Sequence, residues 1–225
     1  MAERRKSYRG MTLLLALTGF VFLSCLAVVL VLHFRWLYYA DVEYLGLSEL
    51  TGLSPAVIRE NYDVLIDYNL ALSGVTELQF PSFPMSEEGA IHFKEVRQIF
   101  LVIQYLAAFS GVCFLAGFFQ KKKKQDYAFL KLLSMLTVIL PVLLGILAYV
   151  WWDAFFEIFH KLFFRNDYWL FDPMTDPVIW ILPDQFFGHC AAAVLLLILL
   201  GGGLAAVLYR KLNKKNIRKI NGRLL

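Results

Sequence analysis

The sequence predicts an all-α membrane protein, with four transmembrane helices and a small extracytoplasmic cap formed by two outer loops. Of its 225 residues 59% are hydrophobic and 18% charged, with a mean hydropathy of +0.60, which is too apolar for an ordinary soluble domain. Four uncharged runs are long enough to cross a membrane, and basic residues gather at alternating ends of them. Domains usually contain about 100–200 residues, so the length allows one unit and excludes a multidomain soluble enzyme.

The four predicted spans follow from run length, because a helix needs roughly 20 apolar residues to cross a hydrocarbon core. The runs are 11–32, 98–120, 132–152 and 185–209, and within the last one residues 188–209 are assigned to the fourth span. The first run is longer than the apolar core of a cleaved signal peptide and lacks a small-residue cleavage site. We therefore predict a retained helix at 11–32.

Lys and Arg are distributed very unevenly between the segments that join the spans. Residues 1–10, 121–131 and 210–225 are strongly basic, whereas the long loops 33–97 and 153–187 hold six basic residues against sixteen of the eighteen acidic ones. Since cytoplasmic loops are enriched in Lys and Arg, the basic segments are predicted inside and the two long loops outside. The basic segments need only anionic membrane lipids as partners, and no nucleic-acid partner is predicted.

The two outer loops have the composition of folded segments. Ser54-Pro55 is a helix start signal, and the apolar spacing over 56–72 predicts a helix that lies on the membrane or packs on the second outer loop. Residues 74–80 alternate weakly before Pro81, which suits a short strand, as part of a strand pair, or a turn. The cap is thus expected to be mostly helical. Residues 153–189 contain eleven aromatic residues, which suit an interfacial belt or a cavity for acyl chains.

Two histidines stand out by their distance from the spans. His92 precedes the second span and His160 follows the third by similar lengths, so continued helices would place both at a similar depth outside the membrane, where they can face each other. Glu88 and Glu157 lie one helical turn from His92 and His160, where a carboxylate can orient the ring. The structural alternative is a pair of interfacial histidines. His33 and His189, at span ends, are interpreted as interfacial residues.

Other catalytic signatures are absent from the sequence. Glu157 and His160 form a Glu-x-x-His pair as in carboxylate-bridged metal sites, but a second such pair is missing, so neither a metal nor a cofactor is predicted. There is no Gly-x-Ser-x-Gly elbow and no Walker loop. The three cysteines show no paired spacing for a disulfide or a zinc site.

Three segments have a recognisable pattern: 85–96 (MSEEGAIHFKEV), 159–170 (FHKLFFRNDYWL) and 172–177 (DPMTDP). Together with the four spans in order, they resemble the bacterial lipoprotein intramolecular transacylases over nearly the whole chain. The resemblance implies a four-helix enzyme of the bacterial plasma membrane with its site on the extracytoplasmic side. It further implies transfer of the sn-2 acyl chain of a diacylglyceryl-modified lipoprotein to the α-amine of its N-terminal cysteine, giving a lyso-form lipoprotein.

The two catalytic histidines of the resembled family map onto His92 and His160 through these motifs. One imidazole can take the proton of the attacking amine, and the other can assist the oxyanion or the leaving oxygen; which does which stays open. Further candidates for supporting or substrate-lining roles are Glu88, Glu157, Phe163, Phe164, Asn166, Asp167 and Trp169. Two alternatives remain: a non-enzymatic membrane lipid-binding or assembly protein, and a metal-dependent membrane hydrolase that uses the Glu/His pairs.

Overall fold

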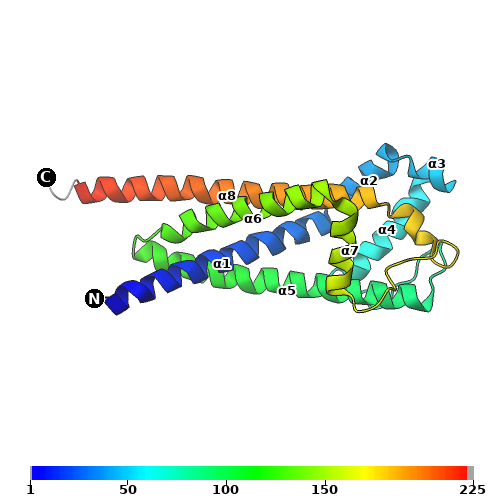
Figure 1. Ribbon diagram of the computed structural model, residues 1–225, viewed down its shortest axis with the longest axis horizontal. Helices are drawn as coiled ribbons and strands as arrows, with labels where there is room; N and C mark the ends of the chain where they lie inside the picture. The colour runs from blue at the N-terminus through cyan, green and yellow to red at the C-terminus, as the bar shows by residue number, and fades with distance from the viewer. Residues whose placement is uncertain (1, 222–225) are drawn as a thin grey trace. The chain divides into compact units, whose positions relative to one another are not determined.

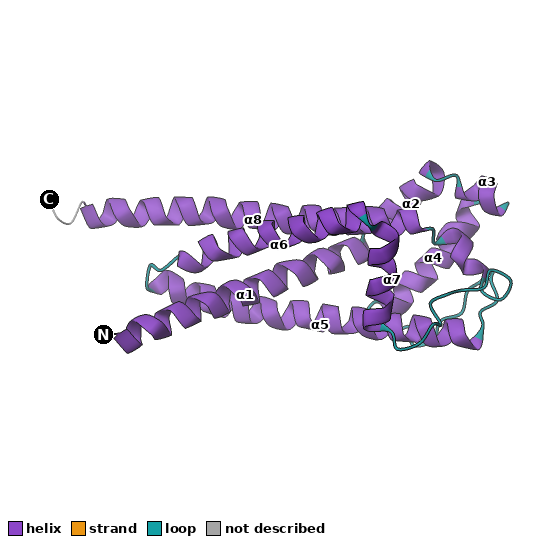
Figure 2. Cartoon of the chain, viewed as in Figure 1, coloured by secondary structure: helices purple, strands orange, loops and turns teal. Residues whose placement is uncertain are grey.

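The computed structural model describes residues 2–221, and within them it contains helices, turns and loops but no strand (Figure 2). Four helices are long and apolar enough to cross a membrane: α1 (Ala2–His33), α5 (Glu87–Lys123), α6 (Ala128–Val150) and α8 (Asp184–Asn221). Their places along the chain can be followed in Figure 1. The prediction of an all-α membrane protein with four spans is confirmed.

The chain divides into two compact units, and the long helices contribute residues to both. The first unit comprises the described residues up to Ala27, Tyr105–Ile146, and those from Val194 onward. Its core contains Leu15, Phe129 and Leu133. A Cβ placed on Gly202 would lie 2.2 Å from the hydroxyl oxygen of Thr137, so the absence of a side chain lets α8 approach α6 closely.

The second unit, Val28–Gln104 and Leu147–Ala193, contains both predicted outer loops in full. Its short helices are α2 (Arg35–Tyr44), α3 (Leu47–Thr51), α4 (Pro55–Asn69), α7 (Trp152–Phe163) and the 3₁₀ helix η1 (Pro177–Ile181). The core joins Ile58 and Ile66 of α4 to Val178 of η1, so the predicted packing of the loop helix on the second outer loop is confirmed. The Tyr38 hydroxyl also donates to the Ile181 carbonyl oxygen at 2.6 Å.

Helix α4 begins as predicted but ends earlier than the expected residue 72. The Ser54 hydroxyl accepts a hydrogen bond from the Val57 amide, which caps the first turn. At the other end, the Gln104 side chain donates to the Asn69 carbonyl oxygen and accepts from the Ala71 amide. Because a distant side chain takes over these backbone groups, the helix stops at Asn69.

Of the two alternatives for 74–80, a short strand or a turn, the strand is wrong, because backbone donors near the start of this segment and just after it bond to side chains. The Val75 amide donates to the Ser73 hydroxyl at 3.2 Å, and the Ser82 amide donates to the Asn61 side chain at 3.2 Å. Pro81 and Pro84 have no amide hydrogen to donate. Throughout 70–86, which the structure describes in full, the chain forms turns and irregular loop instead of a strand pair.

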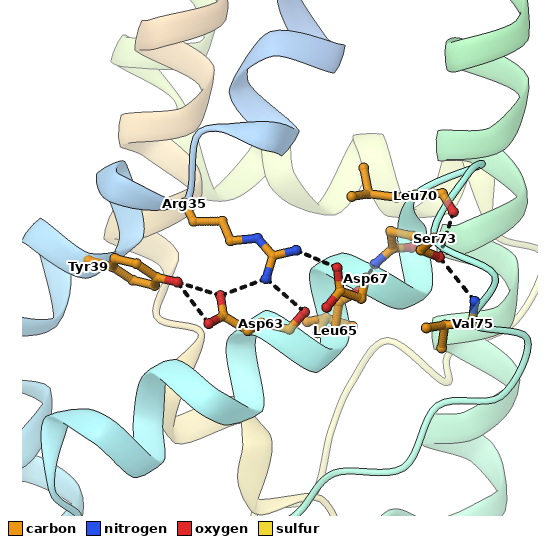
Figure 3. A network of polar contacts seen from close by, with 9 residues as sticks. Arg35, Tyr39, Asp63, Leu65, Asp67, Leu70, Ser73 and Val75 are labelled. Atoms are coloured by element: carbon orange, nitrogen blue, oxygen red, sulfur yellow. Dashed lines mark hydrogen bonds and ion pairs between the residues drawn. The ribbon is translucent and has the colours of Figure 1, made fainter.

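A polar network joins the start of α2 to α4 (Figure 3). The Arg35 guanidinium forms ion pairs with Asp63 at 3.0 Å and with Asp67, one turn further along α4. The Tyr39 hydroxyl donates to the same Asp63 carboxylate at 2.7 Å. These partly buried contacts fix the position of α2 on α4, where both helices also bury apolar residues.

His189 has a more definite role than the predicted interfacial one. Its Nδ1 lies 2.9 Å from both carboxylate oxygens of Asp41, which is only 5% exposed. A buried carboxylate without a partner is strongly unfavourable, so His189 stabilises the junction of α2 and α8.

The predicted third span and the helix expected to continue from it are interrupted. Helix α6 ends at Val150 instead of residue 152, and Trp151 has a non-helical backbone (φ −131°, ψ 55°). Helix α7 then starts at Trp152 and carries His160 near its end. The assumption of one straight helix from the third span to His160 is therefore wrong.

Candidate active site

His92 lies near the start of α5, and the fold fixes this helix end from the second outer loop. The Asp176 carboxylate accepts a hydrogen bond from the Ser86 amide at 2.8 Å, and the Ser86 hydroxyl accepts from the Gly89 amide at 2.9 Å. Asp176 is 2% exposed, and a negative charge is favourable at a helix N-terminus. A Cβ on Gly89 would lie 2.3 Å from the Asp176 carboxylate, so glycine is required for this approach.

His160 lies in the last turn of α7, where the backbone fixes its tautomer. Its Nδ1 is 2.7 Å from the carbonyl oxygen of Phe156. Since a carbonyl oxygen can only accept, Nδ1 carries the hydrogen and Nε2 keeps a free lone pair. The expected orientation of this ring by Glu157 is wrong, because Glu157 pairs with Lys161 at 2.5 Å.

The structure brings the two histidines together inside an aromatic shell. Their ring centroids are 6.1 Å apart, and Phe164 packs against both, at 4.6 Å from His92 and 5.6 Å from His160. Trp169 stacks on His160 at 4.6 Å with an interplanar angle of 28°. Phe171 also packs against His92, with 5.5 Å between the ring centroids. The predicted meeting of His92 and His160 is confirmed as geometry.

Both rings are neutral at neutral pH because they are shielded from water. His92 lies outside the membrane-spanning part of α5, because the charged residues Glu95 and Arg97 separate it from the apolar stretch of this helix. Burial, reinforced by the neighbouring His160, lowers the pKa of His92 to about 4. Burial also lowers the pKa of His160, partly offset by the Phe156 carbonyl and by the charge of Asp184.

A cavity of about 420 Å³ adjoins His160. Phe156 and Trp169, which both contact the His160 ring, form part of its wall. The remaining lining residues are mostly charged: Asp153, Glu157, Lys161, Asp167, Leu170 and Asp184. Three predicted site residues, Glu157, Asp167 and Trp169, thus line one cavity next to a histidine.

The other predicted site residues differ in their places. Phe164 is buried between the histidines, and the Asn166 side chain donates to the Glu95 carboxylate at 3.1 Å. Phe163 is half exposed and packs on Phe159 instead. Glu88 is exposed and has no hydrogen bond or ion pair among residues 10–216, so its expected contact with His92 is wrong.

Several residues of the site were missed by sequence reasoning. Glu95 lies three residues after His92, on the same helical face, a spacing that could have identified it. Asp176 was visible only as part of a recognised segment. Phe171 and Asp184 carry no local signal, because chain segments far apart in sequence bring them to the histidines.

The residues around Glu157 and His160 do not form a metal-binding set. Glu157 is paired with Lys161, and nowhere in the described part of the chain do three His, Cys, Asp or Glu side chains gather in a way that could hold a metal ion.

The fold and the site define a membrane-embedded helical protein with a pair of neutral histidines in an aromatic shell. The model of the lipoprotein intramolecular transacylase (Lit) family matches residues 13–187. The chain therefore belongs to this family, and it is an acyltransferase, as the three sequence segments predicted.

Solved structures of the membrane-integral lipoprotein intramolecular transacylase from Bacillus cereus are similar to nearly the whole chain. One shares 38% sequence identity, covers 93% of this chain and 97% of that chain, and has a TM-score of 0.90. Two others carry a single histidine substitution, to arginine (35% identity, 97% and 100% covered, TM-score 0.86) and to alanine (36%, 96% and 98%, 0.88). A sequence comparison with curated proteins gives no significant match.

Proposed function

We propose that the protein moves the sn-2 acyl chain of a diacylglyceryl-modified lipoprotein to the α-amine of the same molecule's N-terminal cysteine, with His160 and His92 as the catalytic residues. The observation that carries this proposal is the pair of neutral rings 6.1 Å apart, one of them with a fixed tautomer and next to a cavity. Such a pair suits a reaction that needs one proton acceptor and one proton donor.

His160 is the general base of the proposed reaction. Its Nδ1–H is bound to the Phe156 carbonyl oxygen, so its Nε2 is available to accept the proton of the attacking amine. A terminal amine has a pKa of about 7.7–8.0 and attacks only as the free base. The hydrogen bond to Phe156 also supports the imidazolium that forms, because the charged ring binds a carbonyl oxygen more strongly.

His92 assists the ester oxygen, because its low pKa makes it the weaker base of the two. The amine nitrogen forms a bond to the sn-2 ester carbonyl carbon, and the neutral His92 ring donates a hydrogen bond to the developing oxyanion. The bond from this carbon to the glyceryl oxygen then breaks, and the proton on His160 passes to that oxygen. The products are an N-acyl amide and a free glyceryl hydroxyl, and both histidines are again neutral.

The aromatic shell supports this reaction by excluding water. Phe164, Trp169 and Phe171 pack directly on the two histidines. A water-poor site strengthens each hydrogen bond to the transition state and slows hydrolysis of the ester. The mixed apolar and polar lining also fits a lipid-modified peptide terminus.

The proposed function places the histidines on the extracytoplasmic face of a bacterial plasma membrane, with both termini in the cytoplasm and anionic lipids at the basic segments. The uneven distribution of Lys and Arg supports this orientation. A reporter enzyme that is active only on the extracytoplasmic side is expected to be inactive when fused after Leu225. The same reporter is expected to be active when inserted at Ser73, in the loop that follows α4. An active reporter after Leu225 would contradict the orientation and the outward site.

Mass spectrometry of a lipoprotein N-terminus tests the reaction itself. Co-expression of this protein with a diacylglyceryl lipoprotein is expected to give an N-acyl cysteine with one remaining glyceryl ester. An unchanged diacylglyceryl cysteine would favour a non-enzymatic lipid-binding or assembly protein. Chelators are expected to leave product formation unchanged, whereas activity lost to a chelator and restored by added metal would favour a metal-dependent hydrolase.

A further inference from the structure

A contact outside the histidine pair joins α5 to the segment after α7. Both carboxylate oxygens of Glu95 accept hydrogen bonds from the Asn166 side-chain amide, at 3.1 and 3.2 Å. Glu95 lies three residues after His92 on the same helix. The contact spans 71 positions of sequence, so it fixes the loop after α7 to the helix that carries His92.

Asn166 also bonds to the backbone of the turn that carries Trp169. Its side-chain oxygen accepts a hydrogen bond from the Tyr168 amide at 3.1 Å, and the Leu170 amide donates to the Asp167 carbonyl oxygen at 3.0 Å. The turn thus formed presents Trp169, whose ring stacks on His160 and lines the cavity. The Asn166 side-chain amide donates to Glu95 and accepts from the Tyr168 amide, so the position of this side chain determines the position of the turn.

We propose that Glu95 is a positioning residue for acyl transfer: through Asn166 it holds the turn that keeps Trp169 stacked on His160. The inference rests on the proposed role of His160 as the base. With Trp169 in place, one face of the His160 ring is shielded from water and the cavity wall is complete.

The function of Glu95 depends on its acceptor oxygens and not on its charge. Within residues 10–216 the carboxylate has no ion pair, and the nearby Arg97 lies over the Tyr68 ring at 4.5 Å instead. Glutamine keeps one oxygen that can accept from the Asn166 amide, whereas alanine keeps none. Glu95→Gln should therefore preserve the position of Trp169, and Glu95→Ala should lose it.

The activity test compares Glu95→Ala, Glu95→Gln and Asn166→Ala in full-length protein in lipid. A small misplacement of a catalytic group can cost about 10²-fold in rate, so Glu95→Ala and Asn166→Ala should each lower kcat by roughly 10–100-fold with a smaller change in KM. The double variant should be no worse than the more impaired single one, because both remove the same contact. Glu95→Gln should stay within about threefold of the unchanged protein, as expected when the bond is kept.

A second measurement reports the shielding of His160 directly. Diethyl pyrocarbonate acylates neutral imidazoles, and peptide mass spectrometry gives its rate at each histidine. In Glu95→Ala the rate at His160 should rise severalfold and its pH midpoint should move upward toward 6.5, because water reaches the ring. Loss of a negative charge would move this midpoint downward, so the upward direction identifies entry of water to the ring as the cause.

None of the other titratable groups around His160 is substituted in these variants. Asp153, Glu157 and Lys161 lie on its own helix, Asp184 lies at the cavity and His92 faces the ring, and these five groups stay in place. Asp167 lies on the turn itself, and its movement away from His160 would lower the midpoint, opposite to the expected rise. His33 serves as an internal reference, because it is exposed and its labelling rate should not change. Glu60→Ala is the matched control, since it removes an exposed glutamate of α4.

Three outcomes would overturn the inference: unchanged kcat in Glu95→Ala, Glu95→Gln as impaired as Glu95→Ala, or equal labelling of His160 in all variants. If Glu95→Ala does not fold, Asn166→Ala breaks the same contact from the other side and gives the same measurements. Failure of the proposed function looks different, because then the unchanged protein itself makes no lyso-form product.

Discussion

Replacing either His160 or His92 by alanine is expected to lower the rate of lyso-form production by roughly 10²–10⁴-fold, the range typical of proton transfer by a positioned side chain. His160→Ala removes the base whose Nε2 is free, and His92→Ala removes the donor to the ester oxygen. Both variants should remain folded in membranes, because most of the buried core residues of this unit belong to α2, α4 and η1. Quantitative mass spectrometry of the lipoprotein N-terminus measures the effect.

The control for this experiment is His33→Ala. His33 is exposed, and among the described side chains and backbone its ring bonds to the Val29 carbonyl oxygen of its own helix alone, so activity should be retained. His189→Ala is a poorer control than His33→Ala, because it would leave the buried Asp41 without its partner and destabilise the fold. Full activity in either His92→Ala or His160→Ala would refute the assignment of that histidine.

The same assay across pH tests the protonation states. Burial lowers the pKa of both histidines, that of His92 to about 4. Both rings are therefore already neutral when the pH rises through 6.5. Activity should therefore continue to rise up to roughly pH 8, where the terminal amine of the substrate loses its proton. On acidification below 6.5, the folded protein binds protons less readily than the unfolded chain, so its stability should fall toward pH 4.

Local patterns were sufficient to predict the four membrane helices and the start of α4. Length and hydropathy identify an apolar helix because its signal lies within one segment, and Ser54-Pro55 marks a helix start for the same reason. The meeting of His92 and His160 was also predicted, although by an incomplete route. Helix α6 ends at Val150, and α7 brings His160 to the site as a separate helix.

The contacts that position the site could not be predicted, because they join residues far apart in sequence. Asp176 reaches Ser86 across 90 positions, and Asn166 reaches Glu95 across 71. No periodicity within one segment indicates such a pair. The strand alternative for 74–80 was wrong for a related reason, since Asn61 on α4 binds the Ser82 amide just after this segment.

Acyl transfer is expected to stay within one substrate molecule, with no acyl-enzyme and no phospholipid donor. The chain offers no convincing nucleophile for an acyl-enzyme: Cys190 packs against the apolar core, Cys25 and Cys113 lie on membrane helices, and the Ser86 hydroxyl caps α5. None of them bonds to a histidine in the part of the chain that the structure describes.

A crossover experiment decides whether the acyl donor and the acceptor amine belong to the same molecule. The amine and the sn-2 ester already belong to one lipoprotein, and holding two such groups together can account for up to about 7–11 kcal/mol of a reaction barrier. Two lipopeptides are mixed, one with an isotope-labelled sn-2 chain and the other with a distinguishable peptide, in vesicles of unlabelled phospholipid. Labelled chains should be found only on the amine of their own peptide. Label on the other peptide, or chains from phospholipid labelled in a second arm, would refute transfer within one molecule even if His92 and His160 both proved essential, because the acyl donor would then be a second molecule.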